Sequence, residues 1–196
     1  MKNLIARITV LILVISITAC AQGSGTQQYT NKWGQQVVFH SFEFDAQRDS
    51  KDIEVLDYMY KTANENIVGN PWERRQEGRS NQTTGQTGVM TVGETLYVKW
   101  KIKSTGEVIE KSVDLKPILP ASMKDKKLYF ILEKNNIFIY TISHQSIRGY
   151  FTPAEISQLE ASLVGTRLYM QRFYATHNMV QIYPSQQVIF PYAPKK

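Results

Sequence analysis

Apolar and polar residues alternate along several stretches of this chain, and a period of two is typical of half-buried β-strands. Residues 95–103 show the clearest alternation, with an apolar face formed by Leu96, Val98, Trp100 and Ile102. The opposite face carries three lysines, which we expect to meet glutamate side chains or water. The turn residues Ser-Thr-Gly follow at 104–106, so residues 107–115 are predicted to return as the antiparallel partner strand.

Four further stretches are rich in β-branched and aromatic residues and are predicted to be strands. They are residues 36–45, 53–60, 127–133 and 137–143. The last two form a predicted hairpin, in which Asn135 and Asn136 suit the positive φ of a tight turn. Residues 167–174 and 179–183 are predicted to form a third hairpin around His177 and Asn178.

One helix is predicted in the C-terminal half of the chain. The run Thr152-Pro153-Ala154-Glu155 has the order of an N-cap, a proline at the first helical position and a capping-box acid. An apolar face follows and Gly165 is a natural stop. Together with the strands, this helix predicts a mainly β (α+β) fold. Its expected architecture is an antiparallel β-sandwich or a strongly curved sheet with one short packed helix.

Residues 62–93 lack this alternation and contain five glycines among Asn, Gln and Thr. We predict a long loop here, and long loops within a compact domain are often functional or disordered. The segment carries the candidate partner-binding residues Trp72, Arg74, Arg75 and Arg79. Trp and Arg are enriched at the energetic centres of protein interfaces. The alternative is a mobile loop whose Trp72 packs back on the core.

The N-terminus has the order of a secretory signal peptide, with basic residues followed by a short apolar core. Lys2 and Arg7 supply the charge, and residues 8–19 form the twelve-residue core. A bilayer-spanning helix needs about 20 apolar residues, so this core is too short to be an uncleaved anchor. We therefore expect an exported protein.

The end of this leader, Ile17-Thr18-Ala19-Cys20, resembles the lipobox of bacterial lipoproteins. The resemblance implies that the Cys20 thiol receives a diacylglyceryl group, that the leader is cut before it, and that the new amino group is acylated. Several acyl chains would then anchor the protein permanently in a bilayer. By the sorting rule of enteric lipoproteins, Ala21 indicates the outer membrane. The alternative is an ordinary cysteine in an ordinary cleaved leader.

These features divide the chain into three parts. Residues 1–19 are the predicted lipoprotein signal peptide, 20–32 the lipidated cysteine and a flexible tether, and 33–196 a single β-rich domain. The formal net charge is +6, and it falls to +4 when the two basic residues of the leader are removed. This mildly basic surface is a solvated one or complements an acidic partner or anionic head groups. Nucleic acid is not an expected partner of an exported, anchored protein.

The sequence offers little chemistry. None of His40, His144 and His177 has another His or Cys at metal-ligand spacing, and no phosphate-binding loop or nucleophile elbow occurs. Asp45, Asp49 and Asp52 lack the terminal glutamate of a Ca²⁺ loop, so a solvated turn explains them. A dispersed triad of a serine with His144 and Asp114 stays open, although nothing selects it. We expect no catalytic residue, no metal, no cofactor and no enzymatic activity.

Two pieces of the domain are similar to a group of small Gram-negative lipoproteins found beside type VI secretion genes. The matching residues are 88–101, 112–120, 127–130 and 137–140. Some members of that group resemble immunity proteins, which bind and block a toxic effector, often a phospholipase, in the periplasm. The resemblance therefore implies a periplasmic, membrane-anchored immunity protein whose partners are the bilayer and a secreted effector.

Two other classes of function remain open. One is a structural or accessory envelope lipoprotein of a secretion or surface-polymer system, which would be encoded beside apparatus genes rather than an effector gene. The other is a small-ligand-binding lipoprotein that uses the interior of a curved sheet. A large apolar cavity would favour the ligand binder, whereas a filled core with an exposed aromatic loop would favour protein binding.

Overall fold

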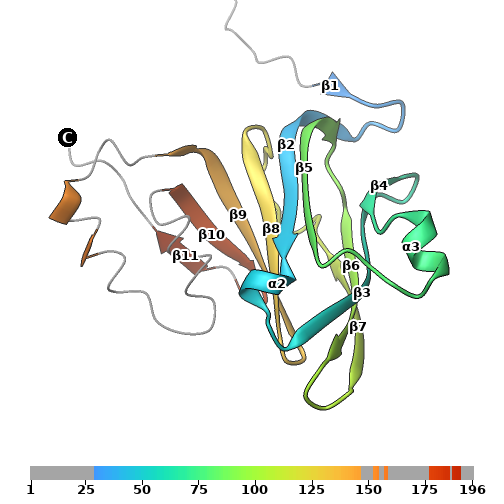
Figure 1. Cartoon of the computed structure of the whole chain (residues 1–196). Helices are drawn as coiled ribbons and strands as arrows, with labels where there is room; N and C mark the ends of the chain where they lie inside the picture. The colour runs from blue at the N-terminus through green and yellow to red at the C-terminus, as the bar shows by residue number, and fades with distance from the viewer. Residues whose placement is uncertain (1–28, 147–151, 155–156, 159–176, 186, 191–196) are drawn as a thin grey trace, which may run out of the picture.

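The computed structural model describes residues 29–146, 152–154, 157–158, 177–185 and 187–190. These residues form two β-sheets whose facing sides share one hydrophobic core (Figure 1). The predicted mainly β fold is confirmed. Two short helices that the sequence did not predict, α2 (Ala46–Asp49) and α3 (Trp72–Gln76), lie in the connections between strands.

The larger sheet, called sheet A, has the strand order β1-β2-β8-β9-β10-β11, and β5 also pairs with β2. Its strands are β1 (Tyr29–Thr30), β2 (Gln36–Asp45), β5 (Thr83–Thr91), β8 (Lys126–Glu133), β9 (Asn136–Ser146), β10 (His177–Tyr183) and β11 (Gln187–Phe190). The pairs are antiparallel except for β2 and β8, which run parallel. This parallel pair joins strands far apart in the sequence, and it differs from the fully antiparallel fold that we expected.

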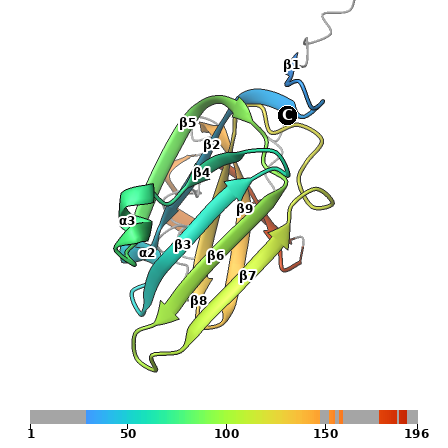
Figure 2. The same ribbon diagram turned by 90° about the vertical axis from the view of Figure 1, so that its right-hand side faces the viewer.

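The smaller sheet, called sheet B, is antiparallel throughout and crosses the face of sheet A (Figure 2). In spatial order its strands are β4 (Asn66–Gly69), β3 (Ile53–Lys61), β6 (Thr95–Ile102) and β7 (Val108–Asp114). The predicted hairpin of β6 and β7 is confirmed. The lysine row of β6 faces outward, with Lys99 near Glu110 and Lys101 near Glu54, each at 3.9 Å.

The core between the sheets is built largely from aromatic rings. The Phe42 and Tyr60 rings stack with centroids 4.9 Å apart, and the Phe44 and Phe130 rings lie 4.6 Å apart. Each such pair adds about 0.5–1.5 kcal/mol beyond its buried area. Trp100 of β6 is 0% exposed, and its Nε1 donates a hydrogen bond to the Lys134 carbonyl at 2.8 Å. That bond ties sheet B to the β8–β9 hairpin of sheet A.

Two predicted turns are wrong in detail. In the β8–β9 hairpin the residue with positive φ is Lys134, at 52°, and Asn136 is already the first residue of β9. His177 and Asn178 are not a turn but the start of β10, which pairs with β9 and β11. The predicted strand at 167–174 lies outside the described residues.

The helix predicted from Thr152 lies mostly outside the described residues as well. Those that are described, 153–154 and 157–158, are helical. Ser157 Oγ donates a hydrogen bond to the Pro153 carbonyl at 3.0 Å.

The segment 62–93 is not a long loop, and this prediction is corrected. It holds β4, α3 and β5, and β5 pairs with β2 at nine successive positions, from Val37 opposite Thr91 to Asp45 opposite Thr83. The run that forms β5 lacks apolar alternation, so the pairing with β2 determines its structure. The fold also includes residues 29–32, which were assigned to the tether, because β1 pairs with β2.

Candidate functional site

The predicted partner-binding residues lie on and just after α3, at the edge of the sandwich beside β4 (Figure 1). Pro71 fixes the backbone before the helix, and no residue of α3 is buried. Trp72 is 67% exposed, so it does not pack back on the core. Burying such a side chain against a partner would stabilise a complex, because an indole removes a large apolar area from water.

Two side-chain amides hold this segment in place, one within the segment and one against β3. Asn70 is buried, and its Nδ2 donates to the Arg79 carbonyl at 2.8 Å, which closes the segment across α3. Gln82 bonds the backbone of Val55 with both ends of its amide, accepting from the nitrogen and donating to the carbonyl at 2.8 Å each. These bonds give partners to the backbone groups of Val55, where the pairing register of β3 shifts between Val55 and Asp57. Sequence reasoning missed both amides, because a lone Asn or Gln in a polar run carries no signal.

The three arginines differ in their freedom. Arg75 is half-buried, and its Nη2 donates to Asp57 Oδ1 of β3 at 3.1 Å. Arg79 is exposed and pairs with Glu77. Arg74 is exposed, and its carbonyl accepts from the Arg79 backbone nitrogen at 2.8 Å. The structure therefore places the four predicted residues on α3 and the turn that follows it, which we call the α3 surface. Of the three arginines, Arg75 is the one paired with a strand of the sandwich.

A second candidate site lies on the face of sheet A that points away from sheet B. A hollow of about 300 Å³ opens there between five strands. Its lining combines hydroxyl groups with basic side chains: Ser41, Thr87, Lys127, Ser143, His144 and His177. Phe39 lies beside it, with its ring edge-on to His144 at 5.8 Å. Sequence spacing gave no sign of this hollow, because strand pairing alone brings these residues together.

Ser41 is the centre of the polar contacts in the hollow. Its Oγ lies 2.9 Å from His144 Nε2 and 2.8 Å from Thr87 Oγ1. A serine beside a histidine is the geometry of an activated nucleophile when a third group orients the imidazole. Asp114, the acid considered with His144, ends β7 in the other sheet and accepts from the Lys116 backbone nitrogen at 3.1 Å. The structure therefore forms the serine–histidine pair and does not complete that triad.

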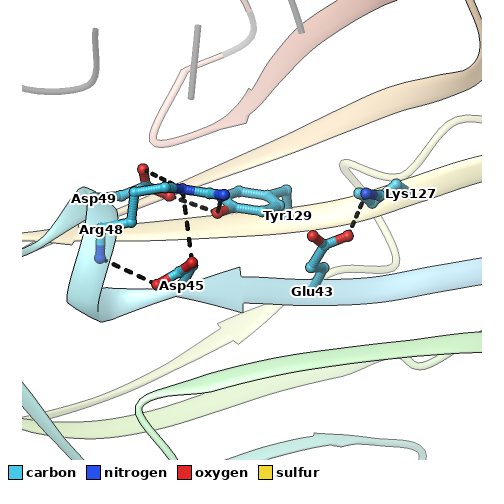
Figure 3. A network of polar contacts seen from close by, with 6 residues as sticks. All are labelled: Glu43, Asp45, Arg48, Asp49, Lys127 and Tyr129. Atoms are coloured by element: carbon cyan, nitrogen blue, oxygen red, sulfur yellow. Dashed lines mark hydrogen bonds and ion pairs between the residues drawn. The ribbon is translucent and has the colours of Figure 1, made fainter. Parts of the chain in front are cut away.

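Positive neighbours shape the electrostatics of the hollow. Burial lowers the pKa of His144, and Lys127 lowers it further, while Asp125 and Glu43 oppose the shift. Burial also lowers the pKa of His177, followed by Lys127 and His144. Lys127 itself forms an ion pair with Glu43 (Figure 3). The lowered pKa values favour neutral imidazoles at pH 7, and among the described residues Lys127 and Glu43 form an ion pair beside them.

Beyond that ion pair, Figure 3 shows a network that fastens α2 to β8. Asp49 was expected in a solvated turn, but its side chain is only 2% exposed and accepts from Tyr129 Oη at 2.5 Å. Arg48 Nη2 donates to the same Tyr129 oxygen at 2.9 Å. Asp45 caps α2 by accepting from the Arg48 backbone nitrogen at 3.1 Å. Burial raises the pKa of Asp49, although its bonds to Tyr129 and Arg48 lower it. This network therefore has a structural role, because it links α2 to Tyr129 of β8.

The expected lipid anchor stays untested by the geometry. Cys20, the expected lipidation site, lies outside the described residues. Within the described ranges, His, Cys, Asp and Glu form no group that could hold a metal ion, and no helix is long and apolar enough to cross a membrane. Comparison of the chain with protein-family models, curated proteins and solved structures finds no match.

Proposed function

We propose that this protein is a lipid-anchored envelope protein whose β domain binds a protein partner through the α3 surface. In its sharper form, the proposal is that the partner is a secreted antibacterial effector and that the protein neutralises it as an immunity protein. The observation that carries the proposal is Trp72, an indole 67% exposed on a helix whose Arg75 bonds Asp57 of the sandwich.

The filled interior supports protein binding over ligand binding. A small-molecule site is a concave, mostly apolar cavity. The positions between the two sheets are instead occupied by large buried side chains, among them Trp100, Tyr58 and Phe42. Exposed aromatic side chains lie outside this core: Tyr29, Trp33 and Phe39 on or near β1 and β2, and Trp72 on α3, where three arginines lie close to it in the chain.

The rigidity of the α3 surface supports the same proposal. An interface residue that is already held loses little conformational entropy on binding, so more of its contact energy appears as affinity. Asn70 and Gln82 fix the two ends of the segment, and Asp57 fixes Arg75. Trp72 and Arg74 are thus presented on a supported turn.

The anchor proposal rests on Cys20. Acylated there, the protein would stay on the periplasmic side of the envelope, at the outer membrane by the rule for Ala21. An inhibitor of an effector that acts in the periplasm must be present where the effector acts, and the anchor would supply that location.

The test is survival of cells that make the effector. The product of the neighbouring gene is expressed in the periplasm with the protein, without it, or with the Trp72→Ala variant. We expect killing without the protein, survival with it, and loss of protection for Trp72→Ala. Trp33→Ala, at an exposed indole distant from α3 in the sequence, serves as the matched control. Equal killing with and without the wild-type protein would end the immunity proposal.

A further inference from the structure

The hollow of sheet A combines groups that share one chemical preference. Lys127, His144 and His177 are basic, and three hydroxyl groups line the same 300 Å³ space. Oxygen atoms that carry negative charge are the natural partners of such a set, because charge-assisted hydrogen bonds are about twice as strong as neutral ones. The hollow shares no lining residue with the α3 surface.

We propose that the hollow binds a small oxyanion, a phosphate or a carboxylate, held by Lys127, His144, His177 and the hydroxyl of Thr87. This site is independent of the proposed function, because it lies on sheet A and α3 lies beside sheet B.

The hydrogen-bond chain through Ser41 explains how the site would take an anion. When His144 is neutral with Nε2 unprotonated, Ser41 donates to it and Thr87 donates to Ser41. When His144 gains a proton, Nε2 can only donate, so Ser41 must accept from it and its own hydroxyl hydrogen becomes free to be donated to Thr87. The Thr87 hydroxyl hydrogen is then available to a ligand. Protonation thus adds a charge and turns the chain into a donor.

The charges that face the histidines set the direction of the pH dependence. His144 faces Lys127, Asp125, Glu43, His177 and the buried His40, and His177 faces Lys127 and His144. Burial, followed by repulsion among the basic groups, favours the neutral imidazoles in the empty hollow. An anion among them reverses this preference, so binding takes up protons and strengthens as the pH falls.

Glu43 makes anion binding depend on the charge of the two histidines. At neutral pH its carboxylate balances Lys127, and it opposes an incoming anion. Protonated histidines therefore strengthen binding. Because phosphate itself passes from dianion to monoanion over this range, the pH comparison uses sulfate, whose charge is constant, and we expect sulfate to bind about tenfold more tightly at pH 5.5 than at pH 7.5, as one added charge-assisted hydrogen bond provides.

The experiment is calorimetric titration of inorganic phosphate into the protein purified from membranes of the producing cell. Lys127→Gln and Ser41→Ala should each weaken binding at pH 5.5 about tenfold or more. The matched control is Lys99→Gln, which removes a lysine from a comparable cross-strand pair with Glu110 on sheet B and should bind as the wild type does.

Histidine NMR supplies a second readout that a merely misfolded variant would not mimic. Phosphate should raise the pKa of two histidines in the wild type, and the pKa of His40 should not rise, because a charged His144 lowers it. Displacement of bound phosphate by phosphatidylglycerol vesicles, and not by phosphatidylcholine vesicles, would identify a lipid head group as the source of the oxyanion. Retained phosphate would identify a soluble one. Undetectable binding at pH 5.5, or equal binding by Ser41→Ala, Lys127→Gln and the wild type, would overturn the site.

Discussion

At the scale of single residues, Trp100 and Lys134 connect the two sheets. Trp100 is fully buried, and its indole N–H donates a hydrogen bond to the carbonyl of Lys134, which has a positive φ in the β8–β9 turn. Neither residue on its own indicates this hydrogen bond in the sequence. The alternation of residues 95–103 placed Trp100 in the core, but only the packed sandwich shows which acceptor its nitrogen reaches.

Replacing Trp100 by Ala should destabilise the protein by about 3–5 kcal/mol, because the change leaves a large cavity and an unbonded Lys134 carbonyl. Urea unfolding measures this change. Trp33→Ala, at a side chain that is 44% exposed, should change the free energy of unfolding by less than about 0.5 kcal/mol. Equal effects of the two substitutions would contradict the assignment of Trp100 to the core.

The described histidines predict how stability depends on pH. His40 is 0% exposed, donates from Nδ1 to the Val38 carbonyl at 3.0 Å and lies with Nε2 3.2 Å from Tyr60 Oη. Burial lowers its pKa from the ordinary value of 6.5, and the pKa values of His144 and His177 are lowered too. The unfolded chain therefore binds more protons than the native protein below about pH 6.5, and acid favours unfolding.

We accordingly expect the free energy of unfolding to be constant between about pH 7 and pH 9 and to fall between pH 6.5 and pH 5. Urea denaturation at a series of pH values in a phosphate-free buffer measures it. NMR titration of the imidazole signals provides the check, since His40 should protonate at a lower pH than a free histidine. Stability that rises as the pH falls over this interval would refute the assignment of a buried neutral His40.

At the scale of the elements, the sequence predicted best what local alternation determines. β2, β3, β6, β7, β8 and β9 match predicted strands, because apolar residues recur at every second position in them or they are rich in branched and aromatic side chains. β5 was missed because its sequence, TTGQTGVMT, has no apolar face and becomes a strand by pairing with β2. The parallel β2–β8 pair was missed because no local pattern specifies a partner so far away.

The same limit applies to the candidate sites. Trp72 and the arginines could be named from the sequence, because residue type alone marks interface chemistry. The hollow could not, because Ser41 and His144 are 103 positions apart and meet only through the register of sheet A.

Gly93, between β5 and β6, tests the packing of these elements. A Cβ at this position would lie 2.3 Å from Cε2 of the buried Tyr60 ring, which stacks on Phe42. Gly93→Ala should therefore destabilise the protein by about 1–3 kcal/mol, the usual cost of overpacking. Gly88→Ala meets nothing within 4 Å and should change stability by less than about 0.5 kcal/mol. Thermal unfolding of both variants decides the matter, and an unaffected Gly93→Ala would count against the described packing of Tyr60.

At the scale of the whole molecule, we propose that a lipid-anchored N-terminus carries a β-sandwich with two separate binding surfaces. The α3 surface offers an indole and arginines for a protein, and the hollow of sheet A offers basic and hydroxyl groups for an oxyanion. The two lie on different sheets, so substitutions in one should leave the other unchanged, as expected for sites without shared side chains.

The anchor is tested by the mass of the mature protein. We expect a chain that begins at Cys20 and carries a diacylglyceryl group and an amide-linked acyl chain, found in the membrane fraction. Cys20→Ser should abolish the acylation and the membrane association. An unmodified thiol in the mature protein would contradict the anchor.

The most direct test of the central claim is the affinity between the purified protein and the product of the neighbouring gene, the proposed effector. We predict a stable complex that Trp72→Ala weakens about thirtyfold or more, the effect of a hot spot of about 2 kcal/mol. Trp33→Ala should leave the affinity unchanged. Failure of the wild-type protein to bind the effector, or equal affinity of Trp72→Ala and the wild type, would contradict the account.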